Sequence, residues 1–284
     1  MNRTSFPLEQ DMEYVRVNGY RVRFLEKGKG FPLLLLHGLG ASLEWWQFNV
    51  DPLSRHYRVI ALDFIGFGYS SKLLSEYSLS NASKFLISFL DTLKIKKISL
   101  IGNSMGGLIS LSTALQYPER IEKLVLVDNA GFGRELSFIL RLGSLFPVGE
   151  IVLALRNKFT ANILLSQLFY NPQKLPPNLT SCVLRILDLP HSSDVLLRAL
   201  RYGVNLRGLR RDIWKPIQGK VSLLNHPTLI IWGDEDKIIS VDQAYRGKRM
   251  ISRSKLHIFE KCGHLPQVEW AEEFNHLVLG FLQS

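Results

Sequence analysis

The chain has 284 residues, of which 46% are hydrophobic and 21% charged, a balance that excludes an intrinsically disordered protein and indicates a folded one. Its net charge of +10 predicts a weak attraction to anionic surfaces, such as membrane lipid or an acidic partner. No stretch interleaves basic with aromatic residues, so we expect no nucleic-acid partner. The length suits one main domain with an insertion.

The cysteines and the N-terminal residues indicate the cellular compartment of the protein. Two cysteines, Cys182 and Cys262, cannot build a disulfide framework, and their spacing matches no zinc motif. Residues 1–14 contain no apolar region typical of a signal peptide, and the apolar runs of the chain are too short to span a bilayer. We therefore expect a soluble, cytoplasmic protein without stable membrane insertion; the sequence carries no signal for an oligomeric state.

The chain opens with a hairpin signal. Residues 12–17 and 20–25 alternate apolar and polar side chains around Asn18-Gly19, a dipeptide typical of two-residue hairpin turns. Three short, nearly all-apolar runs follow, at 33–36, 57–62 and 97–101. Such runs indicate strands covered on both faces, as in a parallel sheet.

Helical patterns lie between and after these runs. Residues 80–93 repeat apolar side chains at helical spacing behind a serine cap, and a helix at 105–117 precedes a strand at 123–127. The alternation resumes with a strand at 228–232, a helix near 241–250, a strand at 255–259 and a closing helix at 269–282. This order predicts a mostly parallel α/β sheet wrapped by helices, with functional sites beyond the carboxyl ends of its strands.

The alternation is interrupted between residues 132 and 218. Apolar residues recur there at helical spacing, broken by several prolines, and no clear buried strand appears. We therefore predict a core domain formed by residues 1–131 and 219–284, with residues 132–218 as an inserted helical cap.

Residues 102–107, Gly-Asn-Ser-Met-Gly-Gly, follow an apolar strand and open a helix, the setting that a G-x-S-x-G turn requires. Such a turn lifts the serine hydroxyl out of the sheet, and a side chain at Gly102 or Gly106 would collide with the neighbouring strand or helix. Ser104 is therefore the candidate nucleophile. The alternative is a glycine turn that serves only to start a helix.

A serine hydroxyl is a weak nucleophile at neutral pH and needs a base. Among seven histidines, His264 is best placed, because it lies in the loop between the last expected strand and the last helix. The others fall in expected helices, strand interiors or surface turns, except His37, which begins a glycine turn and is expected to brace it.

The base in turn needs a group, usually a carboxylate, that holds its tautomer. We favour Asp236, because two residues beyond the turn after strand 228–232 the chain can fold back toward His264. Asp234 is expected to tighten that turn and Glu235 to face solvent. Asp128, at the end of the preceding strand, is an alternative, since its carboxylate could reach the same histidine.

Hydrolysis through a serine also needs two amide donors for the oxyanion. Met105, the residue after the nucleophile, is expected to supply one. Leu39, in the glycine turn at 37–40 after the first parallel strand, is expected to supply the other.

Five motifs in register resemble the α/β-hydrolase superfamily: His37-Gly38, DFIGFGYS at 63–70, GNSMGG at 102–107, WGDED at 232–236 and Gly263-His264. The order serine, aspartate, histidine is also the family's order. The resemblance covers nearly the whole chain outside 132–218, which corresponds to the family's variable cap. It implies an eight-stranded sheet and neither a metal nor an organic cofactor, and it supports Asp236 over Asp128.

The resemblance also limits which activities of the superfamily are expected for this chain. Dehalogenases and epoxide hydrolases place an aspartate where this chain has Ser104, which argues against both. Carbon–carbon bond hydrolases of ring-cleavage products resemble the chain at 102–107 and 262–282, but usually follow the histidine with an aromatic residue, where this chain has Leu265.

The cap contains an apolar stretch between residues 138 and 155. If these residues line the pocket, they favour a substrate with an apolar acyl or alkyl group. The alternative is that they pack the cap onto the core. We therefore expect a carboxylesterase of short- to medium-chain hydrophobic esters that works through an acyl-enzyme. The alternatives are a carbon–carbon bond hydrolase with the same catalytic residues and a ligand-binding member of the fold without catalysis.

Overall fold

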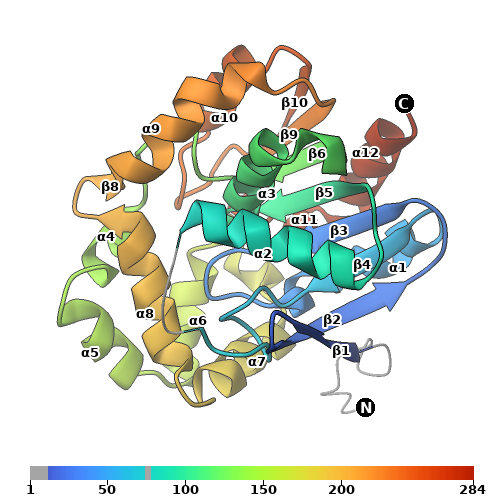
Figure 1. The fold of residues 1–284 in the computed structure, drawn as a ribbon. Coiled ribbons are helices and arrows are strands. Elements are labelled where there is room, and N and C mark those ends of the chain that lie inside the picture. The colour runs from blue at the N-terminus through green and yellow to red at the C-terminus, as the bar shows by residue number, and fades with distance from the viewer. Residues whose placement is uncertain (1–11, 74–77) are drawn as a thin grey trace.

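The computed structural model describes residues 12–73 and 78–284 and contains an eight-stranded sheet with the strand order β1-β2-β4-β3-β5-β6-β9-β10 (Figure 1). The six strands from β4 to β10 in this order run parallel to one another, and the hairpin β1-β2 adds two antiparallel strands at one edge. The expected fold class, a mostly parallel eight-stranded sheet of the α/β-hydrolase type, is confirmed.

The N-terminal hairpin consists of β1 (Met12–Val17) and β2 (Tyr20–Lys27), with Val17 opposite Tyr20. Asn18 and Gly19 both have positive φ, 50° and 86°, as a two-residue type I′ turn requires. The hairpin signal of the sequence therefore predicts this turn correctly. β2 joins the hairpin to the rest of the sheet through antiparallel pairing with β4.

The parallel strands coincide with the apolar runs of the sequence, although several are longer by one or two residues. They are β3 (Pro32–Leu36), β4 (Arg58–Leu62), β5 (Ile98–Asn103), β6 (Ile121–Val127), β9 (Thr228–Gly233) and β10 (Ser254–Phe259). β5 and β9 are buried along their whole length, because helices cover both faces of the sheet.

One core cluster lies on each face of the sheet. On the first face, apolar side chains of α2 (Leu79–Thr92), α3 (Met105–Gln116) and α10 (Asp242–Met250) pack against the strands. On the second, α1 (Val50–Ser54), a 3-10 turn at Leu43–Trp46 and α12 (Ala271–Gln283) do so. The closing helix differs from the prediction of one helix at 269–282, because Trp270 is not helical and separates α12 from the short α11 (Pro266–Glu269).

The inserted segment contains five helices before it returns to the core: α4 (Phe138–Gly143), α5 (Val148–Ala154), α6 (Lys158–Ser166), α7 (Pro177–Leu187) and α8 (Ser192–Gly203). It also contains a two-stranded sheet, β7 (Val204–Asn205) with β8 (Gly208–Leu209), which sequence analysis missed because two residues are too few for a periodic pattern.

The expected cap boundaries do not match the packing. The boundary at residue 218 falls inside α9 (Arg211–Lys220), and Ile213 and Ile217 of this helix belong to the main core cluster. At the other end, the fully buried Phe132 also belongs to that cluster. α9 therefore packs on the core, and the segment between Phe132 and α9 remains the predicted cap.

No helix in the described part of the chain is both long and apolar enough to cross a lipid bilayer.

A buried ion cluster fixes the loop that follows β4. Arg23 donates to Asp63 through Nε (2.6 Å) and to Glu44 through Nη2 (2.7 Å), and all three side chains are at most 7% exposed. Asp63 also accepts the backbone amides of Leu43 and Tyr69. Burial works against the charge of Arg23, but the two carboxylates outweigh it and raise its pKa. The aspartate of the segment 63–70 therefore organises the loop.

Replacing Arg23 with Leu is expected to destabilise the fold strongly, because it leaves two buried carboxylates without their counter-ion. The expected loss is about 3–5 kcal/mol of unfolding free energy, measured by urea denaturation. The matched control is Arg246→Leu, which removes the partly exposed ion pair with Glu135 and is expected to cost less than about 1 kcal/mol. Equal losses in the two variants would contradict a structural role for the buried cluster.

Candidate active site

Ser104 lies on the turn between β5 and α3, as expected from its sequence context. Its backbone has φ 56° and ψ −115°, a left-handed conformation that non-glycine residues rarely adopt. A Cβ at Gly102 would overlap the backbone of Gly106 and Gly107, and one at Gly106 would overlap the carbonyls at the end of β3. These glycines allow the close approach that the strained turn needs.

The turn at residues 37–40 lies directly against this serine. A Cβ at Gly38 would stand 3.3 Å from Cβ of Ser104, so the two turns are in contact. His37 braces the turn as expected: its Nε2 accepts the amide of Phe64 (3.1 Å) and its Nδ1 donates to the carbonyl of Gly38 (2.8 Å). Burial lowers the pKa of His37, which favours this neutral form.

His264 and Asp236 form a buried hydrogen-bonded pair. Nδ1 of His264 lies 2.7 Å from Oδ2 of Asp236, and their side chains are 5% and 0% exposed. Oδ1 of Asp236 accepts the amides of Ile238 (2.7 Å) and Ile239 (3.1 Å), so both carboxylate oxygens have partners. The structure brings together the two residues that sequence analysis favoured for the roles of base and acid.

The neighbouring acids also lie where they were expected. Asp234 accepts the amide of Cys262 (3.2 Å), which ties the turn after β9 to the loop that carries His264, and Glu235 is exposed.

The serine and histidine loops are joined through Asn103. Its side-chain amide donates to the carbonyl of His264 (3.2 Å) and to that of Val127 (3.3 Å), so the residue before Ser104 contacts the backbone of His264. The hydrogen bonds of the described residues include none between the Ser104 hydroxyl and the imidazole. Such bonds often form only in the substrate complex.

Asp128, the alternative acid, lies beside this pair but has a different environment. Its Oδ1 accepts the amide of Gly233 (3.0 Å), whereas its Oδ2 is buried without a hydrogen-bond partner. Potential ligand atoms of Asp128, Asp236 and His264 lie within 4.8 Å of one another. Burial and the nearby charge of Asp236 raise the pKa of Asp128 well above its usual range. A protonated Asp128 can donate to Asp236, so its environment suits a supporting neighbour of the pair rather than the ionised acid or a metal ligand.

The Asp128→Asn variant tests this protonation state. In the wild type, the folded state keeps a proton that the unfolded state releases above about pH 4, so this carboxyl makes the fold less stable as pH rises. Asparagine can make the same hydrogen bonds without a titrating group. We therefore expect the unfolding free energy of the variant, minus that of the wild type, to increase with pH in urea titrations. The control Asp128→Ala orphans the amide of Gly233 and is expected to cost about 1–3 kcal/mol. A variant-minus-wild-type difference that falls with pH would show that the carboxyl is ionised in the fold.

Glu269 is a site-supporting residue that sequence analysis missed. Its carboxylate accepts the amide of Gly263 (2.6 Å) in the histidine loop and the amides of Tyr170 and Asn171 in the cap. The amide of His264 donates to the carbonyl of Leu168 (2.7 Å), also in the cap. Burial raises the pKa of Glu269, and these donors oppose that rise. The cap segment 168–171 therefore holds the loop of His264, a long-range contact that no local pattern signals.

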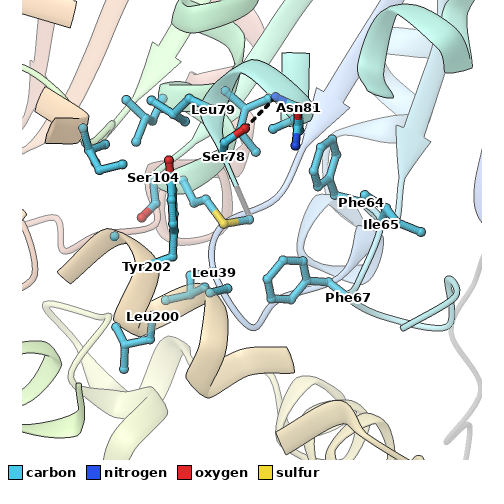
Figure 2. Close-up of a pocket in the computed structure, with 18 of the residues that line it drawn as sticks. Leu39, Phe64, Ile65, Phe67, Ser78, Leu79, Asn81, Ser104, Leu200 and Tyr202 are labelled. Carbon is cyan, nitrogen blue, oxygen red and sulfur yellow. Dashed lines mark hydrogen bonds between the residues drawn. The ribbon is translucent and has the colours of Figure 1, made fainter. Parts of the chain in front are cut away.

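Ser104 borders a cavity of about 350 Å³, within the usual range for small-molecule sites (Figure 2). Leu39 and Met105, the expected oxyanion donors, line the same cavity. Most other lining side chains are apolar; they come from the core, from α4 and from α8, and include Phe64, Phe67, Leu108, Leu140 and Leu200. Among the lining residues of the described chain, Lys84 alone carries a charge.

Comparison with known proteins identifies the family of the chain. The chain matches the model of the α/β hydrolase fold over residues 32–159 and 170–270. It is 31% identical to 2-hydroxymuconate semialdehyde hydrolase of Pseudomonas sp. (strain CF600) over 287 residues, which cover 93% of this chain and 91% of the relative.

Two solved structures are similar along most of their length. A meta-cleavage product hydrolase from Pseudomonas fluorescens IP01 has a TM-score of 0.82 and 26% identity, covering 97% of this chain and 99% of its own. A bacterial membrane phospholipase A has a TM-score of 0.81 and 29% identity, covering 96% and 85%.

The chain belongs to the α/β-hydrolase family, and it is a hydrolase of that family. The expectation of a ligand-binding member without catalysis finds no support among these relatives.

Proposed function

We propose that the protein hydrolyses a carbon–carbon bond next to a ketone in an apolar ring-cleavage product that carries a carboxylate. The observation that carries this proposal is the meeting of the Ser104 turn with the loop of the His264–Asp236 pair, at the wall of a mostly apolar cavity whose described lining residues include one cation, Lys84. The relatives at 31% and 26% identity are named for this class of reaction, which favours it over the ester hydrolysis expected first from sequence.

In the proposed reaction, Ser104 gives its proton to Nε2 of His264 while its oxygen bonds to the ketone carbon. The carbonyl electron pair moves onto oxygen, where the amides of Leu39 and Met105 stabilise it. Asp236 accepts a hydrogen bond from Nδ1–H and so stabilises the imidazolium.

Collapse of this intermediate breaks the carbon–carbon bond. For a 2-hydroxy-6-oxo-dienoate, the enol proton first moves to the carbon beside the ketone, which makes the leaving carbon saturated and the acid a 2-oxo acid. On cleavage the electron pair passes through the conjugated chain onto the 2-oxygen, and this dienolate receives the proton from His264. Water, deprotonated by the same imidazole, then attacks the acyl group on Ser104, releases the second product as an acid and restores the hydroxyl.

Lys84 supports a substrate with a carboxylate. It lies on α2 and lines the cavity, whose other described walls offer apolar and neutral polar groups. An ammonium group at this position can pair with the acid of a dienoate, whereas a simple hydrophobic ester has no charge to place there.

One observation favours ester hydrolysis as a second candidate. Leu265, 3% exposed, packs in an apolar cluster with Trp45 and Phe169, at the position where carbon–carbon hydrolases usually carry an aromatic residue. The similarity to a phospholipase A at 29% identity points in the same direction.

The Ser104→Ala variant is expected to lower the turnover of a 2-hydroxy-6-oxo-dienoate by about a millionfold, because loss of the nucleophile removes the covalent route. Turnover can be followed by the loss of the dienoate's absorbance. The control Ser110→Ala removes a hydroxyl that bonds only to the helix backbone and is expected to retain activity. Rapid turnover of nitrophenyl esters with negligible activity on the dienoate would transfer the assignment to the second candidate.

The Lys84→Met variant separates the two substrate classes. We expect it to raise KM for the dienoate by roughly fivefold, as loss of one exposed charge contact of about 1 kcal/mol implies, while KM for a neutral nitrophenyl ester stays the same. Equal changes for both substrates in steady-state assays would refute a role for Lys84 in binding the carboxylate.

A further inference from the structure

Exposed apolar side chains are concentrated on one part of the cap. Of the seventeen large apolar side chains that are exposed in the described part of the chain, nine lie between residues 138 and 164. Six of them, which we call the cap face, lie on or beside α5 and α6: Phe146, Ile151, Val152, Leu155, Phe159 and Ile163. Phe146 and Phe159 are the most exposed, at 79% and 73%.

The spacing of these residues groups them on the helices. Ile151 and Leu155 are four residues apart along α5 and its C-terminus, as are Phe159 and Ile163 on α6, so the members of each pair are neighbours on the helix surface. Figure 1 shows α5 at the periphery of the molecule, far from α12. Monomeric proteins rarely expose so many large apolar side chains together unless the surface binds something.

The charge around the cap face indicates an anionic partner. Residues 136–188 contain five basic residues and two acidic residues. Glu150 is hydrogen-bonded to Arg201 (2.6 Å) and Asp188 to Arg156 (3.3 Å), so the charge of each acid is compensated. The exposed Lys158 lies between Leu155 and Phe159, in the middle of the apolar residues. Short helices that combine apolar residues with lysine and arginine in this way bind at the headgroup region of membranes.

A second copy of this chain fits the cap face less well. Twofold pairing places the same patch on both sides of the interface, which would bring Lys158 of the two copies to one interface, while Glu150 and Asp188 are already paired with arginines. A bilayer with anionic headgroups supplies both the apolar layer and the opposite charge.

We propose that the cap face docks on an anionic lipid bilayer, with its apolar side chains inserted at the headgroup boundary and Lys158 facing lipid phosphates. The proposal does not depend on the reaction proposed above, because none of the six residues lines the cavity.

Vesicle flotation with the full chain tests the proposal. We expect binding to vesicles of equal parts phosphatidylglycerol and phosphatidylcholine, little binding to phosphatidylcholine alone, and release as the salt concentration rises. The double variant Leu155→Ser/Phe159→Ser is expected to abolish binding. Lys158→Glu is expected to weaken binding by roughly 25-fold, because it changes the charge by two units and each unit contributes about fivefold near an anionic leaflet.

The matched controls lie outside the cap. Leu223→Ser changes an equally exposed apolar residue (75%) and Lys255→Glu an exposed lysine of β10, and both are expected to bind like the wild type. Circular dichroism and the basal hydrolytic activity of each variant check that it is folded.

Wild-type protein that stays unbound with anionic vesicles, or binding that the cap-face variants leave unchanged, would overturn the proposal. A concentration-dependent dimer in light scattering that Leu155→Ser/Phe159→Ser dissociates, without vesicle binding, would assign the cap face to a second copy and overturn it as well.

Discussion

Asp236 carries a carboxylate with almost no access to water, and the arrangement of the site depends on how that group is held. One oxygen faces Nδ1 of His264 and the other accepts two backbone amides just beyond β9. Burying a carboxylate without such partners would cost several kcal/mol of folding free energy. The turn after β9 therefore has to keep this shape. This turn fixes the imidazole of His264. The backbone of His264 is in turn joined to the serine turn by the side chain of Asn103.

The fold was largely predictable because its signals are local. Buried parallel strands are nearly all-apolar, and a two-residue turn with positive φ favours Asn-Gly, so 33–36 and 18–19 could be assigned without long-range information. The boundary predicted at residue 218 falls inside α9, because this helix carries the same apolar spacing as the cap helices. Only its contacts show that Ile213 and Ile217 pack on the core.

The site shows the same division between local and long-range information. Ser104, His264 and Asp236 follow strands whose carboxyl ends meet at one edge, and topology alone brings them close. The contrast between Asp128 and Asp236 was not predictable in the same way, because it depends on which carboxyl receives amide donors and which is left with an unpartnered oxygen. The cluster of Arg23, Asp63 and Glu44 likewise joins residues up to forty positions apart, without a pattern that marks them as partners.

Glu269 has a consequence for how a substrate reaches Ser104. The same carboxylate binds the histidine loop and the cap backbone at Tyr170 and Asn171, so lifting this side of the cap would break several charge-assisted bonds and disturb the base. Segment 168–171 is therefore the fixed edge of the cap. α4 and α8 border the cavity on their own side, and among the described residues neither helix is hydrogen-bonded to the loop of His264, so a displacement there would break none of that loop's hydrogen bonds.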